Sequence, residues 1–289
     1  MQRKLHPLEG IVAVFALFFV LALTIGFAQA QEARAQKTVY LRSSSALVQD
    51  AATSEIVVDK NADAVTPIAS ITKLMTAMVI IDRGLDLEAR IVLSREDVDA
   101  KKGSRSRLQT GAILTRNELL LLALMASENR AAAALGRTYP GGFPAIVAAM
   151  NAKAAELGMT DSHFADPTGL SPSNVASARD LVKLVSAAHE YPLIREYSTR
   201  ERTTVKVFGR PLGFRNTNGL VRSSRWEIGL SKTGYISEAG RCLVMRVRLA
   251  SKDLIVVLLD SWGRQSRIGD INRIRKWLET HTATLRTSS

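Results

Sequence analysis

Cysteine and histidine are scarce in this chain of 289 residues. The single cysteine, Cys242, excludes an internal disulfide and a zinc site of the cysteine type. The four histidines are scattered, and none belongs to a His-Glu-x-x-His pair, so a metallopeptidase has little support and no metal or cofactor is expected. The chain also lacks internal repeats and low-complexity tracts. With 46% hydrophobic and 23% charged residues, it is not a collagen-like, mucin-like or wholly disordered protein.

Acidic residues are few relative to basic ones. The chain has 27 Asp and Glu against 39 Lys and Arg, a formal net charge of +12, and its pI is about 10.1. Such an excess suggests an anionic partner, which could be a nucleic acid, a membrane surface or an acidic polymer. The length allows one large domain or two ordinary ones.

Long hydrophobic runs are also rare. The first one, near the N-terminus, predicts the cellular compartment of the protein. Arg3 and Lys4 precede an uncharged run at residues 11–27, which is followed by Ala28-Gln29-Ala30, an Ala-x-Ala pattern typical of a signal-peptidase site. These parts predict a secretory signal peptide over residues 1–30, cleaved after Ala30. The alternative is an uncleaved N-terminal anchor, because a run of this size approaches a membrane-spanning length. We therefore expect an exported, periplasmic protein.

Export narrows the choice of partner. Removal of the signal peptide takes away two basic residues and one acidic residue, so the net charge falls only to +11. An exported protein rarely meets chromosomal DNA, so no nucleic-acid partner is expected and membrane contact is at most peripheral. The wall and membrane surfaces become the expected polyanions.

The pattern of apolar residues predicts helices in the middle of the chain and strands at both ends. Strands are expected over residues 39–41, 46–48, 55–58, 203–207, 226–233, 242–250 and 254–259. Helices are expected over residues 69–83, 117–135, 144–157, 177–191 and 268–280. The order predicts an α+β protein: an antiparallel sheet flanked by helices, with a helical lobe inserted. The predicted catalytic domain spans residues 38–281, between a polar segment at 31–37 and a frayed tail at 282–289.

The first chemical motif is Ser70-Ile71-Thr72-Lys73. Ser70 is predicted in the first turn of a helix, and positions i and i+3 share a helix face, so the Lys73 amine can lie near the Ser70 hydroxyl. A serine becomes a nucleophile when a base takes its proton, and a lysine can be that base if it is desolvated. A helix-starting serine beside a surface lysine is the simpler alternative.

Two further motifs are weak separately. Ser127-Glu128-Asn129 closes an apolar helix pattern, and a hydroxyl and an amide two residues apart could face a cleft if the helix breaks there. Lys232-Thr233-Gly234 ends a predicted strand, where the glycine would let another backbone approach and a peptide could dock along the edge. Polar residues at a helix end and a turn between strands are the plain alternatives.

In this order, the three motifs are much more specific. Ser-x-x-Lys, Ser-x-Asn and Lys-Thr-Gly form the signature of serine β-lactamases and penicillin-binding proteins. From about residue 39 to residue 280, the chain resembles the low-molecular-weight D,D-peptidases of the bacterial cell wall. Residues 164–170 and 177–181 match that family as well. Residues 232–245 are closer still to its D-alanyl-D-alanine endopeptidase branch.

The resemblance implies a role for each motif residue. Ser70 would attack a D-Ala carbonyl of a peptidoglycan stem peptide and form an acyl-enzyme, with Lys73 as the base and Ser127 as the relay to the leaving amine. The residues implied to bind substrate are Asn129, Lys232, Thr233 and Gly234. The oxyanion hole would consist of the backbone N–H groups of Ser70 and Tyr235. β-Lactam antibiotics would acylate the same serine.

The resemblance leaves three alternative functions to consider. A class A β-lactamase would carry a Glu-x-x-Leu-Asn segment after Ser127, and none is present. A carboxypeptidase of this family usually has a second, all-β domain and an anchoring helix. The 57 residues after Lys232 hold only two expected strands and one helix, which favours the endopeptidase. A non-catalytic sensor or wall-binding module is disfavoured because all three motifs are intact.

Overall fold

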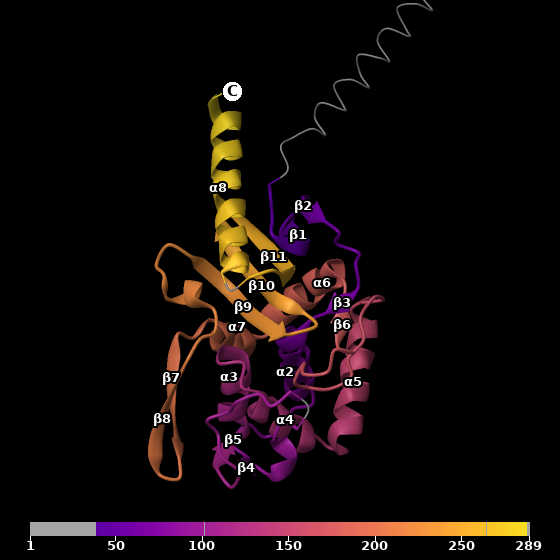
Figure 1. Ribbon diagram of the computed structural model, residues 1–289, viewed down its shortest axis with the longest axis vertical. Coiled ribbons are helices and arrows are strands. Elements are labelled where there is room, and N and C mark those ends of the chain that lie inside the picture. The colour runs from indigo at the N-terminus through magenta and orange to yellow at the C-terminus, as the bar shows by residue number, and fades with distance from the viewer. Residues whose placement is uncertain (1–38, 101, 264, 288–289) are drawn as a thin grey trace, which may run out of the picture. The chain divides into compact units, whose positions relative to one another are not determined.

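The structure of the chain, a computed structural model, describes residues 39–100, 102–263 and 265–287. Its largest sheet has five antiparallel strands in the order β2-β1-β11-β10-β9 (Figure 1). Their bounds are β1 Ser43–Asp50, β2 Ile56–Lys60, β9 Glu227–Ile236, β10 Gly240–Leu249 and β11 Lys252–Ser261. Strands from both ends of the sequence share one sheet, which confirms the predicted α+β class.

Helices cover both faces of the sheet. Strand β11 has a run of six buried residues, so its side chains are covered on both faces. Helix α6 (Ala178–His189) and helix α8 (Ser266–Thr287) each pack on β1, β10 and β11. In α8, Ile271, Ile274 and Leu278 are buried, in keeping with a helix that packs on the core.

The helical lobe is built around α2 (Thr72–Asp82), in which the nine residues from Thr72 to Ile80 are buried. A short 3-10 turn, η1 (Ala69–Ile71), leads into α2. Around α2 lie α3 (Arg116–Met125), α4 (Asn129–Arg137), α5 (Gly142–Glu156) and α7 (Pro192–Thr199). Lys73 of the first motif therefore lies in a buried helix in the middle of the protein, and Ser70 lies in the turn that leads into it.

Short two-stranded sheets and turns complete the lobe. They are β3 (Thr66–Pro67) with β6 (Val175–Ala176), β4 (Arg90–Val92) with β5 (Ile113–Thr115), β7 (Arg202–Val207) with β8 (Arg210–Arg215), η2 (Arg95–Asp97) and η3 (Gly219–Arg222). No helix within the described residues has the length and hydropathy needed to cross a membrane. The predicted signal peptide lies outside the described residues.

Several sequence-based boundaries need correction. Residues 39–41 form no strand, and Tyr40 is 74% exposed, because this short apolar stretch has no partner strand. The single helix predicted over residues 117–135 is two helices, α3 and α4, separated at residues 126–128. Helix α8 continues to Thr287, past the predicted end. Helix α7 and strand β8 were not predicted.

Candidate active site

The turn η1 and helix α2 position the first motif. Ala69 has a positive φ of 48°, which bends the chain sharply just before Ser70. Such backbone strain in a residue other than glycine is common where a side chain must be aimed. The Lys73 Nζ lies 2.8 Å from the Ser70 Oγ, so the i and i+3 positions meet as predicted. This geometry allows the amine to take the hydroxyl proton.

Lys73 is buried, with 1% of its surface exposed. Besides Ser70, its Nζ donates to the Asn129 Oδ1 at 2.7 Å and to the backbone carbonyl of Thr168 at 2.5 Å. Burial lowers the pKa of Lys73 to about 7, against the opposing charges of Asp166 and Glu128. A lysine with a pKa near neutrality has the amine available as a base at physiological pH.

The loop at residues 166–170 is a part of the site whose role the motifs do not reveal. Asp166 accepts backbone N–H bonds from Thr168 and Gly169 at 2.6 and 2.8 Å. Although burial opposes it, these and further hydrogen bonds lower the Asp166 pKa. The loop thereby holds the Thr168 carbonyl on Lys73. In the sequence, residues 166–169 indicate a turn and residues 164–170 match the family, but no pattern there indicates that a backbone carbonyl would bind the lysine.

Gly169 explains why this loop can lie so close to the nucleophile. Its φ is +79°, and a Cβ there would lie 2.0 Å from the Ala69 carbonyl oxygen. Only glycine fits this conformation and this contact. The loop is therefore packed directly on the backbone that leads to Ser70.

The second motif lies where the predicted long helix breaks. Ser127, with a φ of +57°, occupies the connection between α3 and α4, and the Glu128 side chain caps α4 by accepting from the Arg130 N–H at 3.4 Å. The break aims both Ser127 and Asn129 at the site. The Asn129 Nδ2 donates to the Ser104 Oγ at 3.0 Å, which ties in another segment.

Strand β9 brings the third motif from the sheet. The Lys232 Nζ donates to the Ser127 Oγ at 2.7 Å and to the Thr233 carbonyl at 2.8 Å. A Cβ on Gly234 would lie 2.9 Å from the Ile68 carbonyl oxygen and 3.1 Å from the Ser70 nitrogen. The glycine therefore allows β9, the edge strand of the sheet, to run close beside the nucleophile.

Lys232 has a different electrostatic environment from Lys73. It is 1% exposed, and burial together with the positive charges of Lys73 and Arg267 holds its pKa well below the usual value. Arg267, from the first turn of α8, donates to the carbonyls of Gly234 and Cys242 at 3.3 Å each. The motifs gave no signal for this arginine, which lies 35 positions after Lys232.

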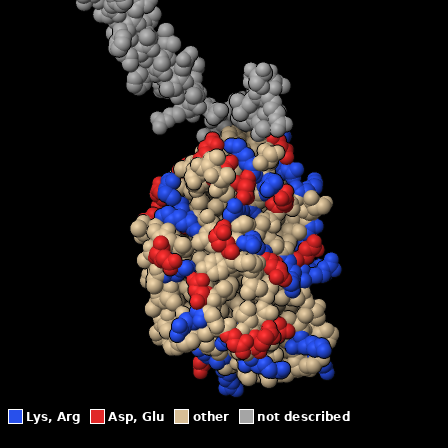
Figure 2. Space-filling view, turned by 180° about the vertical axis from the view of Figure 1, so that it is seen from behind, with Lys and Arg blue, Asp and Glu red and all other residues tan. Residues whose placement is uncertain are grey.

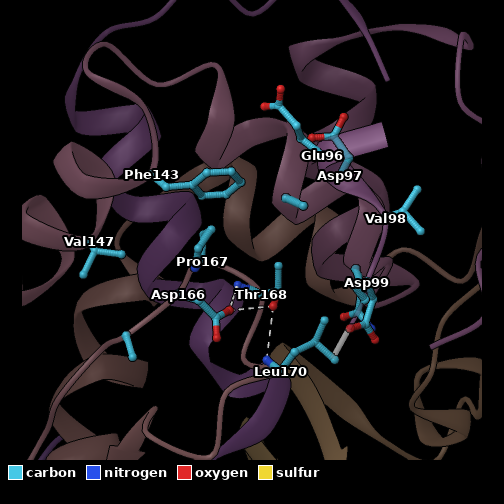
Figure 3. Close-up of a pocket in the computed structure, with 14 residues that line it drawn as sticks. Glu96, Asp97, Val98, Asp99, Phe143, Val147, Asp166, Pro167, Thr168 and Leu170 are labelled. Carbon is cyan, nitrogen blue, oxygen red and sulfur yellow. Dashed lines mark hydrogen bonds between the residues drawn. The ribbon is translucent and has the colours of Figure 1, made fainter. Parts of the chain in front are cut away.

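A pocket of about 360 Å³ opens on one side of Asn129. Figure 3 shows Asp166 and Thr168 near its base, with Phe143 and Val147 along one wall and Val98 and Asp99 opposite. Among the described residues, the charged ones that line it are all acidic: Glu96, Asp97, Asp99 and Asp166. Within the described part of the chain, no group of three or more His, Cys, Asp or Glu residues could hold a metal ion.

Together, the fold and the three joined motifs define a serine enzyme with two buried lysines in its active site. A family model described as D-alanyl-D-alanine carboxypeptidase, of peptidase family S11, matches residues 30–263. The chain belongs to this family. The sequence-based resemblance is thus confirmed.

Individual relatives agree with the family. A "D-alanyl-D-alanine endopeptidase" of Pseudomonas aeruginosa is 47% identical over 84% of this chain and 79% of its own length. One of Escherichia coli with the same name is 42% identical over 93% of this chain and 88% of its own length. The crystal structure of the Streptomyces K15 DD-transpeptidase is 26% identical and superposes with a TM-score of 0.78, covering 84% of this chain and 99% of that one.

Proposed function

We propose that this chain is a serine D,D-peptidase that cleaves peptidoglycan cross-links as a D-alanyl-D-alanine endopeptidase, in the manner of penicillin-binding protein 7. The observation that carries the proposal is the 2.8 Å contact between the Lys73 amine and the Ser70 hydroxyl, inside a site where the Lys73 pKa is about 7. The names of the two endopeptidases that are 47% and 42% identical support the choice of bond.

The first half of the reaction forms the acyl-enzyme. The neutral amine of Lys73 takes the proton of the Ser70 hydroxyl, whose oxygen attacks the D-Ala carbonyl of a stem peptide that lies along the open edge of β9. The backbone N–H groups of Ser70 and Tyr235 stabilise the oxyanion. Ser127 passes a proton to the leaving amine, and the C–N bond of the cross-link breaks.

The second half releases the stem peptide. Water attacks the ester on Ser70 and gives up a proton to the neutral Lys73 amine. The acyl C–O bond breaks, the proton passes from Lys73 to the serine oxygen, and the stem peptide leaves with a new carboxylate. Asn129 holds Lys73 and the substrate amide, and the Thr233 hydroxyl bonds a substrate carboxylate or carbonyl. Lys232 attracts the anionic substrate, and the approach of a carboxylate favours its charged form. A β-lactam follows the same reaction steps up to acylation of Ser70 and so acts as a covalent inhibitor.

Penicillin labelling tests the nucleophile. A fluorescent penicillin is expected to label the purified protein, and Ser70→Ala is expected to abolish labelling because the attacking oxygen is lost. Ser237→Ala, in the turn after β9, removes an exposed hydroxyl and serves as the matched control. Undiminished labelling of Ser70→Ala would overturn the site assignment.

Digestion of purified cross-linked muropeptides tests the bond. Release of monomers without loss of terminal D-Ala, measured by mass spectrometry, is expected of the endopeptidase. Loss of D-Ala alone would instead establish the carboxypeptidase after which the family is named. Binding of penicillin without turnover of either substrate would favour the sensor.

The site of action is a further part of the proposal. We propose that the protein is exported to the periplasm and that its signal peptide is cleaved after Ala30. In the periplasm, the cutting of cross-links would serve wall organisation and cell shape. The support is the charged, apolar and small-residue pattern of residues 1–30. N-terminal sequencing of the protein from the periplasmic fraction is expected to begin at Gln31. An intact start in the membrane fraction would establish the anchor.

A further inference from the structure

A basic groove opens between residues 103–107 and the β7–β8 hairpin, on the side of the second motif. Two adjoining hollows of about 770 and 640 Å³ share Arg107, Phe214 and Arg215, and together they are called the basic groove. Five arginines line it: Arg105, Arg107, Arg130, Arg202 and Arg215. Figure 1 shows the hairpin beside β5 and α3, and β7 contacts β5.

The positive charge of this groove is largely uncompensated. Among the described residues, five arginines face only two carboxylates in its lining, those of Asp99 and Glu128. Arg105, Arg107 and Arg215 are exposed, and none has a carboxylate within 4 Å among the described residues. By contrast, Figure 2 shows basic and acidic side chains interspersed over the face seen there.

The two walls of the groove are held together. The Arg107 guanidinium lies over the ring of Phe214, 4.2 Å from its centre, and Phe214 is buried. Such a cation–π contact fixes the loop against the hairpin. The arginines of the two walls are therefore placed before a ligand arrives.

The lining of the groove includes neighbours of the catalytic residues. Ala126 and Glu128, on either side of Ser127, line it. Ser104 also lines it and accepts the 3.0 Å hydrogen bond from Asn129. Since Ser127 is proposed to give a proton to the leaving amine, the leaving group would start beside residues that line this groove. In the pocket on the other side of Asn129, the described lining residues that carry a charge are acidic.

We infer that the basic groove binds the second stem peptide of a cross-link, the one whose amine is released when the C–N bond breaks. This inference rests on the proposed function. A carboxypeptidase releases one D-Ala and needs no long site for an anionic peptide, whereas an endopeptidase releases a whole peptide with free carboxylates. Exposed arginines are suited to such carboxylates because the guanidinium binds them in a bidentate manner.

Binding measurements on a catalytically inactive variant test the inference separately from substrate cleavage. The probe is a purified cross-linked muropeptide dimer, with Ser70→Ala present so that nothing is cleaved. Adding Arg105→Gln, Arg107→Gln and Arg215→Gln is expected to weaken dimer binding about tenfold or more. Binding by the unaltered groove should weaken with salt. Arg83→Gln, Arg90→Gln and Lys276→Gln remove three exposed charges elsewhere and form the matched control.

Activity with Ser70 present gives the second readout. The triple groove variant is expected to lose at least about tenfold in kcat/KM on the dimer, while penicillin labelling stays within about twofold. Arg105→Gln with Arg215→Gln leaves the Arg107–Phe214 contact intact and is expected to show part of the same loss. Replacement of all three arginines by lysine is expected to recover part of it, because charge returns without the bidentate geometry.

The outcomes separate this inference from the proposed function. Dimer binding and cleavage that are unchanged in the triple variant would overturn it, as would an equal fall in dimer cleavage and penicillin labelling. Loss of binding to a DNA duplex or to phosphatidylglycerol vesicles, with dimer cleavage unchanged, would assign the groove to another polyanion and overturn it too. Failure of the wild-type protein to label with penicillin would instead contradict the proposed function.

Discussion

The two buried lysines come from different lobes and show how the same side chain acquires different chemistry. Lys73, on α2, has three oxygen acceptors and two acidic groups near it, and its pKa is about 7. Lys232, on β9, has Arg267 and Lys73 as its nearest charges. Burial lowers the pKa of both lysines, but only Lys73 has acids that oppose the effect. Lys73 is therefore suited to proton transfer near neutral pH. Among the described residues, Lys232 has no neighbouring acid to compensate its charge, so its positive form is stabilised when an anionic substrate approaches.

The largest effect is expected from substitution of the lysines themselves. Lys73→Met should slow penicillin acylation by about 10²- to 10⁴-fold, because a general base is lost. Lys73→Arg should be equally slow, since arginine stays protonated. Lys232→Arg should be faster than Lys232→Met, because its role needs only positive charge. Stopped-flow measurements of the acylation rate test these four variants, and the melting temperature of each variant checks that it is folded. If arginine restored the acylation rate better at residue 73 than at residue 232, the roles assigned to the two lysines would be contradicted.

Substitutions of two glycines are expected to affect the free energy of unfolding and the acylation rate to different degrees. Gly169→Ala should cost about 2 to 4 kcal/mol of unfolding free energy, because its Cβ would meet a backbone oxygen at 2.0 Å with φ at +79°. Gly234→Ala, whose nearest contact is 2.9 Å, should cost about 1 to 2 kcal/mol but slow acylation more than the stability loss explains. Urea unfolding and acylation rates measure both.

Gly84→Ala is the control for the glycine pair, since it has a φ of +64° and no atom within 4 Å of the added Cβ. It should show the cost of the backbone conformation without a collision. If Gly169→Ala were no more costly than Gly84→Ala, the close packing of the 166–170 loop on η1 would be contradicted.

The smallest effect is expected from pH and from Glu128. A base with a pKa of about 7 is mostly protonated at pH 6 and mostly neutral at pH 8, so acylation should rise about tenfold over that range. The Glu128 charge favours protonated Lys73, so Glu128→Gln should lower that pKa and move the rise to lower pH. Glu156→Gln, on the exposed surface of α5, should leave the profile unchanged. A rise that moves to higher pH would contradict the assigned electrostatics.

The motifs predicted much of the site because each is local. Ser70 and Lys73 meet through helical spacing, and Gly234 permits the close backbone contact that was expected. The break between α3 and α4 was foreseen only as a condition for Ser127 and Asn129 to face a cleft. Helix α7 was not predicted, and it has only eight residues. Strand β8 was not predicted either, since Pro211 and Gly213 weaken a strand pattern.

The sequence by itself determined the fold class, the family and the three motifs, since these depend on periodicity and residue order. Tertiary structure alone placed the Thr168 carbonyl on Lys73, set Arg267 beside Lys232, and joined residues 103–107 to the β7–β8 hairpin in one basic groove. The physical reason is that charge, burial and hydrogen bonding act through space. Residues about a hundred positions apart share one field only after the chain has folded.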